Sequence, residues 1–394
     1  MKSNITYRVA AEKGGACSKS SSRKLSMLPL SQKSLKQTKT TEKDGTHYEK
    51  TSRILALLLS LVAVFSLFGC GSKDADGDSS DDNTVYTISW AHSSSTNDRL
   101  ALATEKMAAE LEEASGGRLK IEHYPASQLG AEREILEGVA LGTIDCGIIS
   151  SGVVAGFSNS VYVTNMPYLI DDREVGWKVY DGEFGQMLGK KTEEEGGWKF
   201  LGWCDNSLRM FSNTKREIQT PADMVGLKIR TQENDIHMAI VNSLGASATP
   251  VAFSELYTAL QQGTVDGQEN GVALTYSMGF NEVVKYLTYL PHIYDPYIVC
   301  MSNAKWNSLP ADLQELMQEY ATKYCQYERE FNLQNDDEYL QKMVDAGLKV
   351  YYPTEEQAQQ FVDATAGVED LIRAKVGDEL VDSYKDAVAA AKAE

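Results

Sequence analysis

The chain lacks the short motifs by which many enzymes bind a cofactor, a metal ion or a phosphate. Its 394 residues contain no GxGxxG, GxSxG, CxxC or HExxH pattern. These absences argue against dinucleotide binding, serine hydrolysis, dithiol chemistry and a zinc protease site. The nearest approach to a phosphate loop, residues 185–192, has three residues between its glycines and lies where a helix is expected. We therefore predict a protein that is not an enzyme and that needs neither cofactor nor metal.

Histidine and cysteine are scarce and carry no recognisable spacing. The five histidines are scattered along the chain without metal-ligand spacing. Four cysteines follow Cys70, and their spacings match no zinc or redox motif. They allow zero, one or two disulfides, and we favour free, mostly buried thiols at Cys146, Cys204, Cys300 and Cys325.

Positive charge is scarce outside the first part of the chain. Residues 1–69 hold twelve Lys and Arg against four Asp and Glu, so the remainder carries −26 while the whole chain carries −18. Nucleic-acid binding depends on Lys and Arg that neutralise phosphates, and adhesion to an anionic membrane needs the same charges. The acidic body therefore argues against both kinds of partner.

An apolar run near the start of the chain is the first positive signal. Residues 54–68 follow Lys50 and Arg53 and precede Gly69 and Cys70. The run is short for a membrane span and fits the core of a signal peptide. It resembles a bacterial lipoprotein signal, although Phe68 stands where a small residue is usual. We predict a signal peptide over 54–69 and a lipid anchor on Cys70, which places the rest of the chain outside the cytoplasm; the alternative is a short membrane anchor.

Two segments beside the signal carry no pattern of a folded domain. Residues 1–53 are rich in Lys, Ser and Thr without hydrophobic periodicity, and we interpret them as a non-structural leader from a mis-assigned start codon. Residues 70–84 are acidic and rich in Gly and Ser. We predict a flexible tether there, with a reach of about 20 Å.

From residue 85 onward the sequence alternates between strand and helix patterns. Its first β-α-β-α-β series predicts an α/β fold with a parallel sheet covered on both faces. The spacing of apolar residues predicts strands at 85–91, 119–124, 144–149, 198–203, 209–214, 227–230, 248–250 and 265–268. It predicts helices after Asp98 and Thr354, at 132–142, 235–244, 254–262 and 378–392, and one almost unbroken helix from Asp312 to Ala346.

The most specific pattern lies between residues 226 and 270. It reads GLKIRT at 226–231 and LGASATPVAFSELYTALQQGTVDGQEN at 244–270. This block resembles the solute-binding proteins of tripartite ATP-independent periplasmic (TRAP) transporters, DctP type. Supporting pieces that extend the resemblance over roughly 85–390 are Gln128–Glu134, Leu141–Asp145, Asn165–Leu169, Asp172–Glu174 and Tyr294–Tyr297.

The resemblance implies a two-lobed fold similar to periplasmic binding proteins (type II-like), with a long interdomain helix. The expected first lobe is 85–207 with about 297–335, and the expected second lobe is 208–296 with about 336–394. It also implies a monomer that captures a small organic acid, of the C4-dicarboxylate or sugar-acid type. Delivery would be to the small and large membrane subunits of a TRAP permease. A sensory binding lobe and, less so, an extracytoplasmic hydrolase are the alternatives.

Arg230 is the leading candidate for ligand binding. It closes a predicted strand at the carboxyl end, where open α/β sheets bind ligands, and its planar fork suits a carboxylate. The resemblance implies ligand contacts for Arg209, Asn270 and Phe253 as well, with a structural role as the alternative for Arg209. The predicted contacts from the first lobe are His92, Asn97, Ser150, Tyr168 and Trp203.

Two carboxylates stand beside these residues. Asp266 and Glu269 would repel an anion, so we interpret them as structural or salt-bridged residues instead of a catalytic pair.

Overall fold

The structure is a computed structural model that describes residues 84–333 and 336–393. The predicted leader, the signal peptide, Cys70 and the tether up to residue 83 lie outside the described residues. Within the described ranges, no helix is both long and apolar enough to span a bilayer.

One mixed sheet organises the described residues, with strand order β2-β1-β3-β8-β4-β7-β5-β6 and β9 paired to β8. β1 is parallel to β2 and β3, and β5 is parallel to β6 and β7, as the alternating pattern predicts. We call these triplets the β1 half and the β5 half. The strands are β1 (Tyr86–Ala91), β2 (Leu119–Tyr124), β3 (Cys146–Ser150), β4 (Trp198–Asn213), β5 (Lys228–Thr231), β6 (Ser247–Pro250), β7 (Gly267–Asn270), β8 (Tyr286–Ser302) and β9 (Lys349–Tyr351).

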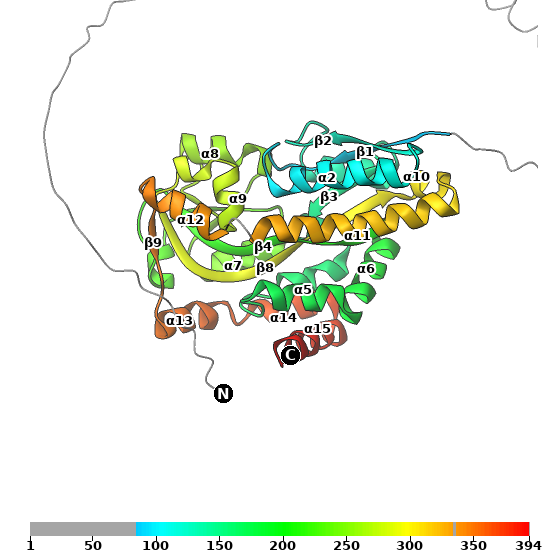
Figure 1. Ribbon diagram of the computed structural model, residues 1–394. Helices are drawn as coiled ribbons and strands as arrows, with labels where there is room; N and C mark the ends of the chain where they lie inside the picture. The colour runs from blue at the N-terminus through cyan, green and yellow to red at the C-terminus, as the bar shows by residue number, and fades with distance from the viewer. Residues whose placement is uncertain (1–83, 334–335, 394) are drawn as a thin grey trace, which may run out of the picture. The chain divides into compact units, whose positions relative to one another are not determined.

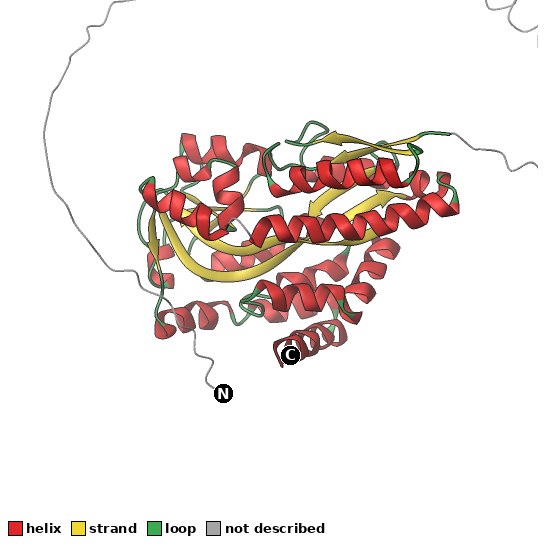
Figure 2. Ribbon diagram, in the orientation of Figure 1, coloured by secondary structure: helices red, strands yellow, loops and turns green. Residues whose placement is uncertain are grey.

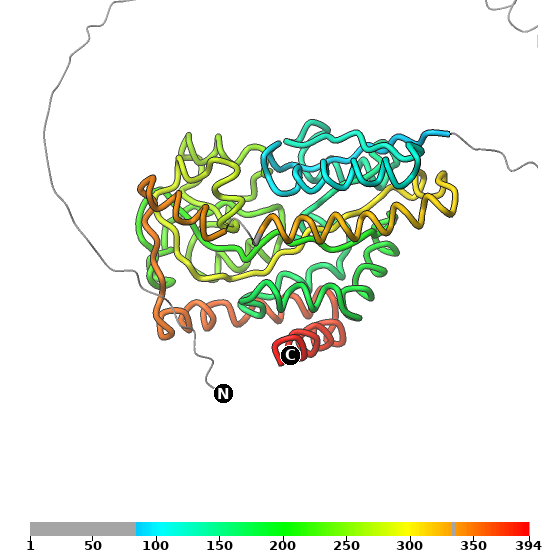
Figure 3. The backbone as a smooth tube through the Cα atoms, viewed as in Figure 1, coloured from blue at the N-terminus to red at the C-terminus, as the bar shows by residue number. Residues whose placement is uncertain are grey.

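Two long antiparallel strands join the halves. β4 and β8 span 16 and 17 residues and pair with each other along most of their length, and Figure 3 follows their curved backbones. The pattern predicts two separate strands where β4 is continuous, and it misses β8. The expected lobe boundaries, at 207/208 and 296/297, fall inside these strands, close to an irregularity between Asp205 and Ser207. Because β4 and β8 pair antiparallel with each other and with their neighbours, the sheet is mixed, although the pattern predicts a parallel sheet.

Helices cover both faces of the sheet, as Figure 2 shows. The α-helices are α2 (Arg99–Ala114), α3 (Glu132–Leu141), α4 (Ser151–Val154), α5 (Arg173–Asp181), α6 (Glu183–Gly196), α7 (Asp235–Ser243), α8 (Leu256–Gln262), α9 (Val272–Ser277), α10 (Asn303–Ser308), α11 (Ala311–Leu333), α12 (Asp336–Asp345), α13 (Glu355–Thr365), α14 (Val368–Val376) and α15 (Asp378–Ala393). Short 3-10 turns are η1 (Asn159–Asn165), η2 (Pro221–Met224), η3 (Phe253–Glu255) and η4 (Phe280–Glu282).

The predicted single helix from Asp312 to Ala346 is two helices. α11 packs along α2 and β4, beside the β1 half, whereas α12 packs against α9, near the β5 half (Figure 1). The apolar residues of α11, among them Leu313, Met317 and Tyr324, belong to the core cluster of the β1 half. Besides β4 and β8, the α11–α12 pair thus reaches both halves.

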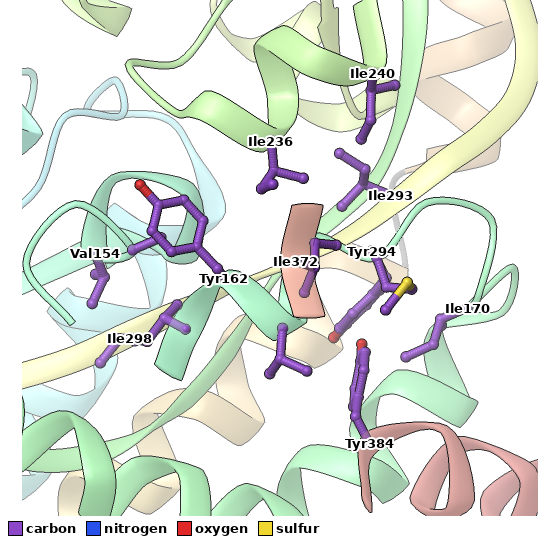
Figure 4. Packing of buried hydrophobic residues seen from close by; sticks show 14 of the residues in the cluster. Val154, Tyr162, Ile170, Ile236, Ile240, Ile293, Tyr294, Ile298, Ile372 and Tyr384 are labelled. Atoms are coloured by element: carbon purple, nitrogen blue, oxygen red, sulfur yellow. The ribbon is translucent and has the colours of Figure 1, made fainter. Parts of the chain in front are cut away.

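The helices after residue 336 contact elements of both expected lobes: α12 packs on α9 and α13 on α7, whereas α14 contacts both α7 and η1. We expected residues 336–394 in the second lobe, but α15 packs on α5 and α6. Tyr384 shares a hydrogen bond of 3.0 Å with Tyr180, and Figure 4 shows Tyr384 and Ile372 in the same cluster as Tyr294. The apolar face of α15 needs a covering surface, and α5 and α6 supply it.

The four cysteines in the described ranges are free and buried, which confirms the favoured interpretation. The sulfur atoms of Cys204 and Cys325 lie 2.9 Å apart, between β4 and α11.

Candidate functional site

A pocket lies between the two halves of the sheet and encloses about 490 Å³ of empty space, including its open mouth. The β5 half contributes the ends of β5 and β7, the segment that follows β6, and α9. The other wall comes from α3, α4, β4 and β8. The lining residues are Ala131, Glu132, Arg133, Val153, Asn206, Arg230, Gln232, Glu233, Val251, Ala252, Phe253, Asn270, Leu274 and Tyr297.

Arg230 brings to this pocket a positive charge that has no ion pair among the described residues. Its side chain is almost fully buried, and its Nε donates to the Val251 carbonyl at 2.8 Å. The Nη1 atom is buried without a partner, and no carboxylate among the described residues forms an ion pair with Arg230. Burial lowers the pKa of Arg230 to about 10. An unpaired buried cation is costly unless an anion joins it.

Arg209 is buried as deeply but is already neutralised. Its guanidinium pairs with Glu269 and, at 2.8 Å, with Asp295. Burial favours the neutral form, yet these two carboxylates hold the pKa of Arg209 above its usual value. Arg209 does not line the pocket. The geometry therefore agrees with the structural role that stood as the alternative to ligand contact.

The two carboxylates interpreted as structural are both paired. Glu269 is fully buried against Arg209, which holds its pKa well below the usual range although burial opposes this shift. Asp266 forms an ion pair with Lys215 at 3.2 Å. This confirms the interpretation of these residues as salt-bridged.

Asn270 and Phe253 line the pocket together with Arg230. Asn270 ends β7, and its Nδ2 donates to Gln268, which pairs in register with Arg230 on β5. The Phe253 ring lies 5.9 Å from the Arg230 guanidinium carbon. Ligand contact by these two residues remains a prediction, and their positions in the lining agree with it.

The five residues predicted from the first lobe do not line this pocket. The His92 Nε2 atom lies 2.9 Å from Nε2 of His123, and burial lowers the pKa of His92 to about 3. Ser150 donates to Asp295 at 2.9 Å, and Trp203 donates to the Gly185 carbonyl at 2.9 Å. The Ser150 hydroxyl and the Trp203 indole N–H are thus engaged within the protein, whereas Nδ1 of His92 is buried without a partner among the described residues.

Asn97 and Tyr168 are the other two. Asn97 lines a second, smaller pocket beside α2 and α12. Tyr168 packs against the core cluster that contains Tyr294 and Tyr384, and its backbone N–H donates to the His292 carbonyl at 2.8 Å. The prediction of ligand contact for all five has no support from the pocket geometry.

Six polar or charged lining residues were not singled out from the sequence: Glu132, Arg133, Asn206, Gln232, Glu233 and Tyr297. Glu132 accepts from Ser93 Oγ at 2.8 Å and from the Ser150 backbone N–H at 3.3 Å. Burial is the main cause that raises the pKa of Glu132 to about 7. The signal for Glu132 was available, because it lies within the Gln128–Glu134 motif.

The fold and pocket agree with one known family. The family model of DctP, bacterial extracellular solute-binding protein family 7, matches residues 90–374. The chain belongs to the DctP family. Its members are solute-binding proteins of TRAP transporters, a family of extracytoplasmic binding proteins and not of enzymes.

Individual relatives agree with this assignment. A solute-binding protein of Verminephrobacter eiseniae is 41% identical over 219 residues, covering 56% of this chain and 65% of the relative. The C4-dicarboxylate-binding periplasmic protein of Rhodobacter capsulatus is 32% identical over 290 residues, covering 72% of this chain and 86% of the relative. The crystal structure of a sugar acid binding protein from Advenella mimigardefordensis, in complex with galactonate, aligns with a TM-score of 0.76 at 26% identity, covering 78% of this chain and 99% of that one. The two-lobed α/β fold expected from the sequence is thereby confirmed.

Proposed function

We propose that this DctP-family protein captures a small organic acid in the pocket and delivers it to a TRAP membrane permease. The observation that carries the proposal is the buried Arg230 guanidinium, which has no ion-pair partner among the described residues. A ligand carboxylate would complete its hydrogen bonds and neutralise its charge. Such a charge-assisted contact contributes about 1.5–3 kcal/mol, a sizeable part of the roughly 8 kcal/mol behind micromolar affinity.

We infer that the pocket closes around the ligand. Residues that follow β5 reach across to the β1 half: Asn234 Nδ2 donates to the Gly152 carbonyl at 2.8 Å, and Gln232 Nε2 donates to Ser150 Oγ at 2.7 Å. β4 and β8 run through both halves, so bending within these strands would open and close the site. In this mechanism the protein binds and releases its ligand without changing it.

The lipid anchor is the second part of the proposal. An acidic body does not adhere to an anionic membrane by charge, whereas an acylated Cys70 would hold it near the permease. Replacing Cys70 by Ser should move the protein from the membrane fraction to the soluble fraction of cells that express the full chain. Continued sedimentation of the Cys70→Ser protein with membranes would contradict the anchor.

Binding is tested by calorimetry of the wild type and of Arg230→Ala against a panel of organic acids. We expect the affinity for the best ligand to fall about 100-fold or more in Arg230→Ala, because the ligand carboxylate loses its buried partner. Lys228→Ala is the matched control, since Lys228 lies on the same strand with an exposed side chain. Equal affinity in Arg230→Ala and the wild type would refute the site.

A further inference from the structure

Among the residues that the structure describes, the pocket offers one cation without an ion pair but several hydrogen-bond acceptors. Arg230 supplies the cation, and it makes no ion pair with Glu132, although both line the pocket. Glu132 presents a carboxylate that uses two of its roughly four acceptor positions, on Ser93 and Ser150. Acceptor positions that the protein leaves open are matched by donors such as ligand hydroxyl groups.

Asn206 adds a second acceptor on the same wall. Its Nδ2 donates to Asp295 Oδ2 at 3.0 Å, which fixes the direction of the amide. The Oδ1 atom of Asn206 is then left buried without a partner among the described residues. A buried acceptor in this state needs a donor, because an unmade hydrogen bond costs free energy.

The charges around this wall disfavour a second ligand carboxylate. Asp295 accepts a hydrogen bond from Asn206 of this wall, and its carboxylate pairs with Arg209. The remaining cation in the lining, Arg133, is half exposed and already pairs with Glu137 at 3.2 Å and with Glu233 at 4.0 Å. A carboxylate placed beside Glu132 would therefore meet a like charge without a free cation to balance it.

We propose that Glu132 determines ligand specificity by accepting hydrogen bonds from ligand hydroxyl groups, so that the pocket selects polyhydroxylated monocarboxylates over dicarboxylates. This inference rests on the proposed function, with the single ligand carboxylate on Arg230. Non-polar lining residues such as Phe253, Val153 and Leu274 would contact the carbon chain of such a ligand. A site that hydrogen-bonds ligand hydroxyls discriminates strongly against analogues without them, because its buried polar groups then stay unpaired.

The titration of Glu132 gives a second readout. Because burial raises its pKa to about 7, the carboxylate that accepts from hydroxyls is mostly present above that pH. The charged groups that act on it are Asp295 on β8 and Arg230 on β5, and Tyr297 on β8 also faces it. Affinity for a hydroxy acid should rise between pH 6 and pH 8, and affinity for a dicarboxylate should fall over the same interval.

Two sets of chain-matched acids test this specificity by calorimetry at pH 8. The four-carbon set is erythronate, succinate and butyrate, and the six-carbon set is galactonate, adipate and hexanoate. We expect the hydroxy acid of at least one set to bind at least about tenfold more tightly than its matched dicarboxylate and its unsubstituted acid. A dicarboxylate that binds as tightly as its matched hydroxy acid in the wild type would overturn the inference.

The Glu132→Gln variant tests the residue itself. Glutamine can keep both protein contacts, since its Oε1 accepts from the Ser150 N–H and its Nε2 donates to Ser93 Oγ. We expect the ratio of hydroxy-acid to dicarboxylate affinity to fall about tenfold and its dependence on pH between 6 and 8 to disappear. Glu134→Gln, on the exposed face of the same helix, is the control and should keep the affinity ratio and its dependence on pH.

The outcomes separate this inference from the proposed function. An unchanged ratio in Glu132→Gln, with binding still abolished in Arg230→Ala, would overturn the role of Glu132 and leave the organic-acid site standing. If none of the six acids binds to the wild type, or if Arg230→Ala binds as the wild type does, the proposed function fails and the specificity assignment fails with it.

Discussion

Arg209 and Arg230 are both buried arginines on strands of one sheet, yet their surroundings differ in charge. Arg209 lies on β4, and the flanking strands β7 and β8 carry Glu269 and Asp295, which pair with it. Arg230 lies on β5, where its in-register neighbours are the uncharged Thr249 and Gln268. The comparison teaches that burial alone does not mark a binding residue. A buried charge that the protein itself balances holds strands together, and one that it leaves unbalanced is available to a ligand.

We expect the largest change in the free energy of unfolding from Arg209→Met, which tests the role of the neutralised arginine. The substitution leaves Glu269 and Asp295 buried without their common partner, so the free energy of unfolding should fall by about 3–5 kcal/mol. Urea denaturation followed by circular dichroism measures it. An unfolding midpoint equal to that of the wild type would break the comparison, because the pairing would then carry no stability.

We expect the smallest change in the free energy of unfolding from Arg230→Met. Without ligand, Arg230→Met removes an unbalanced charge but also leaves the Val251 carbonyl without its donor, and these effects oppose each other. The free energy of unfolding should change by less than about 1 kcal/mol in the same denaturation experiment. A loss as large as that of Arg209→Met would mean that Arg230 holds the fold and is not kept for a ligand.

Sequence patterns predicted much of the β5 half. The strands at 227–230, 248–250 and 265–268 overlap β5, β6 and β7, because short apolar runs and capped helices alternate there with clear boundaries. The patterns were weaker for β4 and β8. A 17-residue strand that contains two prolines and an aspartate carries no clean alternation, and its stability comes from neighbours on both sides.

The sequence also predicted one wall of the candidate site better than the other. Arg230, Asn270 and Phe253 belong to one block of sequence and line the pocket together. The opposite wall was mostly missed, because Glu132 and Asn206 lie on elements that are far apart in the chain and meet only in the folded sheet. Three of the residues expected on that wall instead bond other parts of the protein: His92 contacts His123, Ser150 donates to Asp295, and Trp203 donates to the Gly185 carbonyl.

The sequence by itself determined the family, the alternation of strands and helices, and the position of Arg230 at the end of a strand. It also determined the net charge of the body and the pattern around Cys70. Only the tertiary structure decided which arginine is neutralised and which acidic residue faces the pocket. The physical reason is that charge balance in a buried site depends on which side chains meet across neighbouring strands. Glu269 of β7 and Asp295 of β8 both pair with Arg209, whereas the in-register neighbours of Arg230 are the uncharged Thr249 and Gln268.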